Sequence, residues 1–454
     1  MSGRSRTLST PRWIHEHCED DIATFSSVIL KVGAGPPGAV RVSLPNQFLH
    51  QSPSSPNVTD MSLLVLSASD VDALVSEFTP LDLQLLMARV FAQFSRPRAG
   101  EEAEGKAGRG ICMPPRLSVP MPKHTVLFMP ARLGAVPGQS VDPQANFQGT
   151  AVKVVSVPKS GDPRGLPGTT LVLDEATGAA KAVVNARKLT ALRNAAGSLL
   201  STSIVGPSNP QTLVTLGAGK QIEAHINLHL RRFPSINRCT IVNRTLNERA
   251  SSLKDAVSTQ FPSVTFRLLA SDPISDSTIH TTKEIEQAIR SADLIVCATS
   301  STKALFPSSW VRDGTHIILI GSYTSAMREV DDALIRRSLK PNSSRSTNLI
   351  VDSGEACLHE AGELIAAGLH PSQMVEIGEL VPTDDEGNVD IQAYSSLIEK
   401  KRPRQDGGGF DGPVTIFKSV GVGIQDVAIA SAIVNKALSF SGGRIGTQIA
   451  SYDG

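Results

Sequence analysis

The stretch Leu213–Thr245 reads LVTLGAGKQIEAHINLHLRRFPSINRCTIVNRT and decides the fold. An apolar run ends at two glycines, Gly217 and Gly219, and apolar residues at helical spacing follow them. A second apolar run then ends at Asn243-Arg244. A strand, a glycine turn, a helix and a second strand in this order are typical of the first unit of a dinucleotide-binding fold.

Alternation of strand and helix patterns continues beyond this unit. Helices are expected at 220–233, 246–259 and 282–291, and the strands between them are almost continuously apolar. Such strands are typical of a parallel sheet that is buried on both faces. The preceding part, from Met61 to about residue 205, has alternating strand-like runs, a hairpin turning at Thr177-Gly178, and one long helix. We therefore predict an α/β protein with a Rossmann-type doubly wound sheet and an α+β part.

Composition excludes several classes of protein. The chain has 44 Lys and Arg against 43 Asp and Glu, so it lacks the basic surface expected for nucleic acid or an anionic membrane. Its apolar runs are far shorter than the ~18 residues that would cross a bilayer. The five cysteines are scattered without the spacing of a zinc site or a disulfide framework. We expect no metal, no membrane contact, and a reducing, cytoplasmic location.

The N-terminal part differs from the rest. Residues 1–60 are rich in Pro and Ser without a sustained period, which predicts a disordered extension, and Met61 is an alternative start. Order is expected from the strand Leu63–Leu66, followed by a helix capped by Ser69 or Asp70. The segments 95–113 and 400–412 are charged and Gly-rich, and we predict flexible loops there.

The glycine turn and the arginine predict the cofactor. Backbone N–H groups at the start of the helix would face a pyrophosphate, and glycine would allow its close approach; a plain structural turn is the alternative. The third position of the fingerprint holds Ile222. An acid at the end of the second strand would bind the ribose 2′-OH of NAD, whereas Arg244 suits the 2′-phosphate of NADP. An exposed arginine without a ligand is the alternative reading. NADP is predicted over NAD.

Several motifs in order resemble one family. These are GAGKQIEAH with VNRT, PPRLSVP, LFMPA, VKVVSVP, the long stretch GLPGTTLVLDEATGAAKAVVNARKLTALRNAA, VDSGEA and FKSVGVGIQD. Together they resemble the ornithine cyclodeaminase/mu-crystallin family from about Met61 to Ala437. The resemblance implies a homodimer in which a Rossmann domain (206–399) is inserted into a substrate-binding and dimerisation domain (61–205 with 413–454).

The resemblance also implies roles for three cations. Arg116 and Arg193 match the arginines that hold the substrate carboxylate, and Lys153 matches the lysine beside the reacting carbon and nitrogen. The residues alone support this, because Lys153 interrupts an apolar run where an unpaired ammonium is costly. Alternatives are an outward edge-strand lysine, a structural salt bridge for Arg193 and a solvated surface position for Arg116.

Two positions depart from the family pattern. The usual Thr after the helix arginine is Asn194, which still offers an amide donor. The aspartate of true cyclodeaminases is replaced by Tyr323, and the next carboxylate is Glu329. Because a tyrosine cannot act as a carboxylate base near neutral pH, a cyclodeaminase is disfavoured.

The expected activity is NADPH-dependent reduction of a cyclic imino acid such as 1-pyrroline-2-carboxylate or 1-piperideine-2-carboxylate. Lys153 is the expected catalytic residue. Ornithine cyclodeaminase, which forms proline and ammonia, and a catalytically silent binding protein are the alternatives. The residues expected at the cofactor lie at strand ends, helix starts and the domain crossing: Gly217, Ala218, Gly219, Lys220, Gln221, Asn243, Arg244, Thr245, Arg193, Asn194, Thr299, Ser300, Gly321, Ser322, Val420 and Gly421.

Overall fold

The computed structural model describes most of the chain from residue 62 onward. The described residues are 62–95, 110–134, 147–159, 166–272, 278–341, 345–385, 387–399, 409–441 and 443–453. The expected extension at 1–60, the alternative start at Met61, and most of the loops at 95–113 and 400–412 lie outside them. None of the described helices is long and apolar enough to cross a membrane.

The first part of the chain forms a mixed sheet. Its strands are ordered β16-β1-β7-β6-β5-β4-β2, with β3 paired to β4, and only β1 and β7 run parallel. The bounds are β1 Leu63–Leu66, β2 Ile111–Cys112, β3 Leu117–Pro120, β4 His124–Leu133, β5 Gly149–Pro158, β6 Gly168–Leu173, β7 Ala180–Asn185 and β16 Thr447–Ile449. The expected hairpin is β6–β7, and Gly178 at its turn has a φ of 74°.

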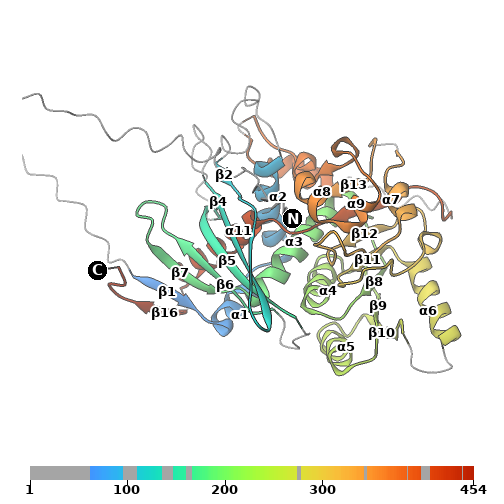
Figure 1. Cartoon of the computed structure of the whole chain (residues 1–454), viewed down its shortest axis with the longest axis horizontal. Helices are drawn as coiled ribbons and strands as arrows, with labels where there is room; N and C mark the ends of the chain where they lie inside the picture. Colours follow the sequence, from blue (N-terminus) through green and yellow to red (C-terminus); the bar gives the residue numbers. More distant parts are fainter. Residues whose placement is uncertain are drawn as a thin grey trace, which may run out of the picture. The chain divides into compact units, whose positions relative to one another are not determined.

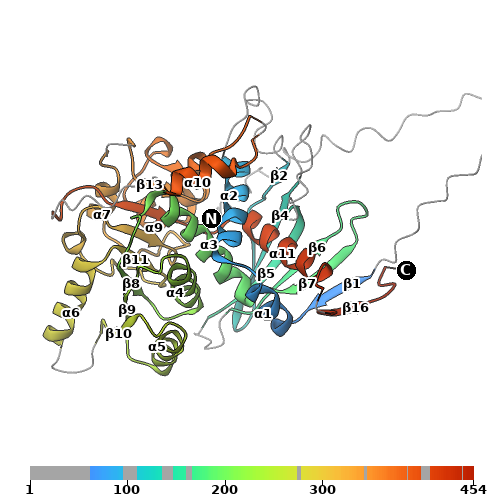
Figure 2. The ribbon, with the colours of Figure 1, turned by 180° about the vertical axis from the view of Figure 1, so that it is seen from behind.

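Four helices belong to this part: α1 Ala68–Ser76, α2 Pro80–Ser95, α3 Arg187–Val205 and α11 Gly423–Leu438. Helix α11 contacts β4, β5 and β6 and also packs on α2 and α3, so it covers one face of the mixed sheet (Figure 2). Helix α1 is capped by Ser67, not by the predicted Ser69 or Asp70. The reason is a capping box, in which the Asp70 carboxylate accepts from the Ser67 N–H at 2.8 Å.

The second sheet is entirely parallel and confirms the predicted Rossmann-type fold. Its order is β10-β9-β8-β11-β12-β15-β13-β14. The bounds are β8 Thr212–Leu216, β9 Arg238–Asn243, β10 Thr265–Ala270, β11 Leu294–Cys297, β12 His316–Leu319, β13 Leu349–Val351, β14 Val375–Glu376 and β15 Thr415–Lys418. The order reverses between β8 and β11, and the glycine turn follows β8. Ligands of such sheets bind outside this switch point.

Helices flank both faces of the parallel sheet, as its buried apolar strands require. Figure 1 shows α4 and α5 on one side of β8–β10 and α6 on the other. The helices of this part are α4 Lys220–Arg232, α5 Glu248–Gln260, α6 Thr278–Ser291, α7 Asp332–Ser338, α8 Gly354–Glu360, α9 Gly362–Ala366 and α10 Ile391–Glu399. The three helices predicted in this part begin and end within four residues of the observed α4, α5 and α6.

One expected domain boundary differs from the structure. The segment 413–454 was assigned to the substrate-binding part, but β15 pairs with β12 and β13 inside the parallel sheet. All four residues of β15 are buried, and a central position gives hydrogen-bond partners to both edges of its backbone. The return to the mixed sheet therefore takes place after Lys418, through 419–422 into α11.

Candidate active site

The glycine turn opens onto a cavity of 680 Å³ at the carboxyl ends of β8, β9 and β11, here named the strand-end cavity. Gly217 has a φ of 111°, and an added Cβ would lie 2.8 Å from the Ala298 carbonyl oxygen, so only glycine suits this position. Gly219 caps α4, and its missing Cβ faces open space. The open space and the first N–H groups of α4 fit the phosphates of a dinucleotide.

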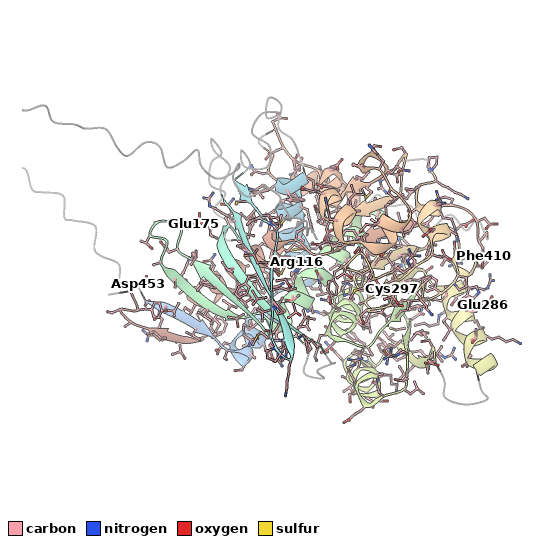
Figure 3. The ribbon with its side chains drawn as sticks, in the orientation of Figure 1. Arg116, Glu175, Glu286, Cys297, Phe410 and Asp453 are labelled. Atoms are coloured by element: carbon pink, nitrogen blue, oxygen red, sulfur yellow. The ribbon has the colours of Figure 1, made fainter. Side chains whose placement is uncertain are left out.

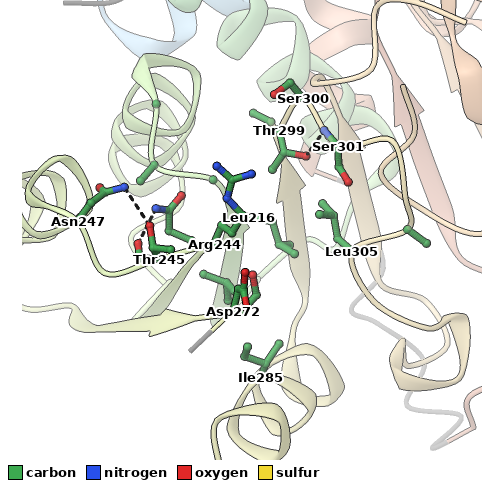
Figure 4. Close-up of a pocket in the computed structure, with 18 of the residues that line it drawn as sticks. Leu216, Arg244, Thr245, Asn247, Asp272, Ile285, Thr299, Ser300, Ser301 and Leu305 are labelled. Carbon is green, nitrogen blue, oxygen red and sulfur yellow. Dashed lines mark hydrogen bonds between the residues drawn. The ribbon is translucent and has the colours of Figure 1, made fainter. Parts of the chain in front are cut away.

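Cations line the same cavity at the end of β9. Arg244 projects into it beside Thr245 and Asn247 (Figure 4), and Arg249 in the first turn of α5 lines it as well. Both arginines are exposed, and neither guanidinium has an ion pair or hydrogen bond with any residue that the structure describes. Arg249 was not named in the sequence analysis. The arrangement leaves two positive charges available to an anion.

Asn243 lines the strand-end cavity and also holds the turn after β9. Its Nδ2 donates to the Thr245 carbonyl at 2.8 Å, so the amide closes the turn after β9. The Thr245 hydroxyl lines the cavity and accepts from Asn247 Nδ2 at 3.4 Å. The turn is thus fixed by its own side chains, as Asn often does, and it presents Arg244.

A second pocket of 240 Å³, here named the lysine pocket, adjoins the strand-end cavity. The two share Ala298, Thr299 and Ser300 as lining residues. The lysine pocket brings together residues from both sheets that are far apart in sequence: Arg116, Lys153, Arg193, Asn194, Gln221, Gly321, Tyr323 and Val420. All three predicted substrate cations therefore line one pocket beside the strand-end cavity.

Lys153 and Arg193 share one carboxylate that the sequence analysis missed. Asp426 Oδ2 accepts from Lys153 Nζ at 2.9 Å, and its Oδ1 accepts from Arg193 Nε at 3.0 Å. All three side chains are at most 4% exposed. Burial lowers the pKa of the Lys153 ammonium to about 8, while Asp426 opposes the fall. The lysine can therefore gain and lose a proton near neutral pH.

Arg193 is held from several sides. Its Nη1 donates to Gln425 Oε1 at 2.8 Å and to the Oδ1 of Asn194. Gly421 has a φ of 83°, and an added Cβ would lie 2.6 Å from Arg193 Nη1, so the crossing segment passes directly over the guanidinium. The predicted substrate arginine is thus also a structural anchor, and the Asn194 carbonyl oxygen is engaged with it.

Arg116 connects the two parts of the molecule. It precedes β3, and Figure 3 shows it between the mixed and parallel sheets. Its Nη2 lies 2.7 Å from Glu360 Oε2 at the end of α8 and donates to the Tyr323 carbonyl at 3.1 Å. Burial raises the pKa of Glu360, and Arg116 opposes the rise. Arg116 is therefore not a solvated surface residue, because its guanidinium is paired and its side chain is only 23% exposed.

Two predicted cofactor residues, Ser322 and Gly421, do not line the cavities at this site. Ser322 is fully buried, and its hydroxyl donates to Glu363 and accepts from Lys418 Nζ at 2.6 Å. Lys220 forms an ion pair with Glu223 at 2.6 Å and lines a neighbouring cavity between α3, α4 and α5, which shares Ala218, Gly219, Arg249 and Ala298 with the strand-end cavity. The sequence did contain a sign of the surroundings of Ser322. Its partner Lys418 ends the apolar strand VTIFK, where a lysine needs a buried partner.

The remaining predicted cofactor residues line one or more of these cavities. Gly217, Ala218, Gly219, Thr299 and Ser300 line the strand-end cavity. Gln221 and Val420 line the lysine pocket. Gly421 is not among the lining residues of these cavities and instead covers Arg193.

The chain is similar in sequence to known proteins. A sequence model of the ornithine cyclodeaminase/mu-crystallin family matches residues 74–441. Ketimine reductase mu-crystallin of Rattus norvegicus is 26% identical over 338 residues, which are 74% of this chain and 87% of that protein.

Solved structures show the same fold. Thermococcus litoralis Delta(1)-pyrroline-2-carboxylate reductase, in complex with NADH and L-proline, matches with a TM-score of 0.62 at 22% identity, covering 85% of this chain and all of that chain. An archaeal alanine dehydrogenase dimer with bound NAD matches with a TM-score of 0.61 at 20% identity, covering 86% and 99%. At these identities the likeness shows the architecture.

Proposed function

Because this chain belongs to the ornithine cyclodeaminase/mu-crystallin family, we propose that it is an NADPH-dependent reductase of a cyclic imino acid. Candidate substrates are 1-pyrroline-2-carboxylate and 1-piperideine-2-carboxylate. The observation that carries the proposal is the junction of the strand-end cavity with the lysine pocket, which share Thr299 and Ser300. A dinucleotide in the first would have its nicotinamide at the mouth of the second.

The residues of the lysine pocket have distinct proposed roles. A reduced nicotinamide, when bound, supplies a hydride to the imine carbon. Lys153 Nζ gives its proton to the imine nitrogen, which becomes the amine of a cyclic amino acid, and Asp426 keeps the ammonium in place. Arg116 and the Arg193 edge that faces the pocket attract the substrate carboxylate. Positioning and electrostatics would supply most of the rate enhancement.

The preference for NADP rests on the end of β9. Arg244 and Arg249 offer two guanidinium groups without partners among the described residues, and Thr245 offers a hydroxyl beside them. A dianionic 2′-phosphate is a better match for this set than a neutral ribose hydroxyl. Asp272 also lines the cavity, so the preference depends on the arginines outweighing one acid.

We also propose a homodimer. Strand β3 is exposed at the edge of the mixed sheet, where Leu117, Val119 and Met121 are 65%, 46% and 47% exposed. An exposed apolar edge strand has unpaired backbone groups and apolar side chains that another chain can pair with or cover. A second copy covering β3 would also lie next to Arg116. Light scattering should give twice the chain mass, and Val119→Lys should shift it to the monomer.

The deciding experiment is a screen of NADPH oxidation with cyclic imino acids, run with and without each substrate. Consumption of NADPH that depends on 1-pyrroline-2-carboxylate or 1-piperideine-2-carboxylate supports the reductase. Ammonia release from L-ornithine without net cofactor oxidation would select the cyclodeaminase instead. Cofactor binding without either reaction would select a silent binding protein.

A further inference from the structure

Two loops that border the lysine pocket meet on one carboxylate. Thr299 follows β11 and Gly321 follows β12, and both line the lysine pocket. Glu329 Oε1 accepts from the Thr299 backbone N–H at 2.6 Å and from its hydroxyl at 3.0 Å. Glu329 Oε2 accepts from the Gly321 N–H at 2.8 Å. One side chain thus joins the carboxyl ends of two neighbouring strands.

The Glu329 carboxylate is tightly packed against the backbone of both loops. A Cβ added to Gly321 would overlap the Thr299 backbone and the Glu329 carboxylate. The backbone around Glu329 follows the first loop, since the Arg328 N–H donates to the Ser301 carbonyl at 2.8 Å and the Leu305 N–H donates to the Glu329 carbonyl at 2.9 Å. The loops after β11 and β12 are therefore joined to each other through Glu329 and its backbone.

A negative charge on Glu329 favours the hydrogen bonds that it accepts from the two loops. The side chain is fully buried, and all three of its partners are donors, so the ionised carboxylate satisfies them better than the acid. Burial raises its pKa to about 7, and the charge of the nearby Lys418 opposes the rise. The three hydrogen bonds offset the cost of burying this carboxylate, and they hold both loops to a single side chain.

We propose that Glu329 is a positioning residue that fixes the loops after β11 and β12 around the nicotinamide half of the cofactor. The inference rests on the proposed nicotinamide cofactor but not on the imino-acid substrate. Glu329 touches neither Arg244 nor the turn after β9, so the adenosine half of the cofactor is bound by other residues. Loss of the carboxylate should loosen one half of the cofactor site and leave the other intact.

Glu329→Gln tests this without requiring turnover. The amide keeps the shape, but its nitrogen cannot accept from a loop N–H, so one loop loses its anchor. Two probes are titrated by calorimetry: NADPH, and the same molecule without nicotinamide, 2′-phospho-ADP-ribose. We expect NADPH affinity to fall about tenfold or more and the affinity of the fragment to change by less than about twofold.

Asp331→Asn is the matched control for a purely structural carboxylate. Asp331 accepts from the N–H groups of Leu334 and Ser308 at 2.8 and 2.9 Å and does not line the cavities described above. It should lower the melting temperature with no change in the ratio of the two affinities. If Glu329→Gln behaves like Asp331→Asn, with both affinities unchanged or equally reduced, Glu329 is only structural and the proposal is overturned.

A second variant keeps the test decisive if Glu329→Gln does not fold. Glu329→Asp retains the charge but is one methylene shorter, so it can anchor only one loop, and the same selective loss of NADPH affinity is expected. If the wild type prefers NADH, the probe pair becomes NADH and ADP-ribose, and only the NADP preference fails. A wild type that binds neither dinucleotide would overturn the proposed function and this inference together.

Discussion

Lys153 on β5 and Asp426 on α11 form a buried ion pair of 2.9 Å across 273 residues of sequence. Arg193 occupies the other oxygen of the same carboxylate. The ammonium therefore keeps a fixed position in the wall of the lysine pocket, although nothing near it in sequence could hold it. Its chemistry depends on this one partner, and the first two predictions follow from the pair.

Lys153→Met should reduce the rate of imino-acid reduction by roughly 10²–10⁴-fold, the usual contribution of general acid catalysis. The thioether keeps most of the length of the side chain and removes the proton donor, while Arg193 still neutralises Asp426. Single-turnover NADPH oxidation with 1-pyrroline-2-carboxylate measures the rate, and fluorescence titration checks that NADPH still binds. Lys181→Met, on β7 of the same sheet, is the control. A near wild-type rate in Lys153→Met would make the lysine structural.

The pH dependence of the reaction should report the same lysine. Because the pKa of Lys153 is about 8, the proton donor is present below that pH, and kcat/KM should fall as the pH rises through it. Asp426 favours the charged ammonium, so Asp426→Asn should lower this pKa further and move the alkaline limb to lower pH. Profiles of kcat/KM for both proteins from about pH 6 to 10 decide the matter. An unmoved limb would assign it to another group.

Cofactor choice should depend on both arginines at the strand-end cavity. Arg244→Ala and Arg249→Ala should each weaken NADPH binding by about ten- to hundredfold and leave NADH binding little changed, since a charge-assisted phosphate contact is lost. Arg267→Ala, an exposed cation on β10 that pairs with Glu284, is the control. Calorimetric titration with both cofactors gives the ratio. Equal losses for NADPH and NADH would remove the basis for NADP.

Two buried histidines on α4 should make the fold sensitive to acid. His225 Nε2 lies 2.9 Å from the Ser198 hydroxyl and His229 Nε2 lies 3.0 Å from the Thr202 hydroxyl, so both join α4 to α3. Burial lowers the pKa of His225 to about 3 and that of His229 to about 4. Below the ordinary pKa of about 6.5, the unfolded chain binds protons that the folded chain does not.

The free energy of unfolding is therefore unaffected by protonation of the two histidines above about pH 6.5, and it decreases as the pH falls toward 4. At about pH 5 the decrease is roughly 2 kcal/mol per histidine. Glu329, with its raised pKa, contributes a slope of opposite sign, so the difference between variants isolates one group. In urea unfolding, His229→Gln should be less stable than the wild type at neutral pH but lose less on acidification. Parallel pH curves for the two proteins would contradict the prediction.

The parallel sheet could be predicted from sequence because each of its units is local. An apolar strand, a turn and an amphipathic helix all fall within about 30 residues, and the glycine turn occurs once among them. Lys153 could be found for a similar reason, since a lysine between valines in a strand is costly without a partner. These features can be predicted because they depend only on residues close to them in sequence.

The features that escaped prediction depend on distant contacts. Nothing near Asp426 in sequence shows that it meets Lys153 and Arg193, because α11 reaches β5 only after the fold closes. The strand β15 was separated from its sheet because its neighbours, β12 and β13, lie far back in the chain. Ser322 follows a strand end, as cofactor residues often do. In the structure its hydroxyl contacts the buried Lys418 and Glu363, which are distant in sequence.

The shared carboxylate has a consequence for which molecules the lysine pocket admits. Arg116, Lys153 and Arg193 bring three positive charges, and the two carboxylates paired with them, Asp426 and Glu360, bring two negative ones, so these five side chains together sum to one positive charge. A ligand with a single carboxylate would neutralise the charge of this set of side chains. An uncharged lactam would leave this positive charge in place, and a dicarboxylate would reverse its sign. Among ring compounds of similar size, we therefore expect one with a single carboxylate to bind more tightly than an uncharged or a doubly charged one.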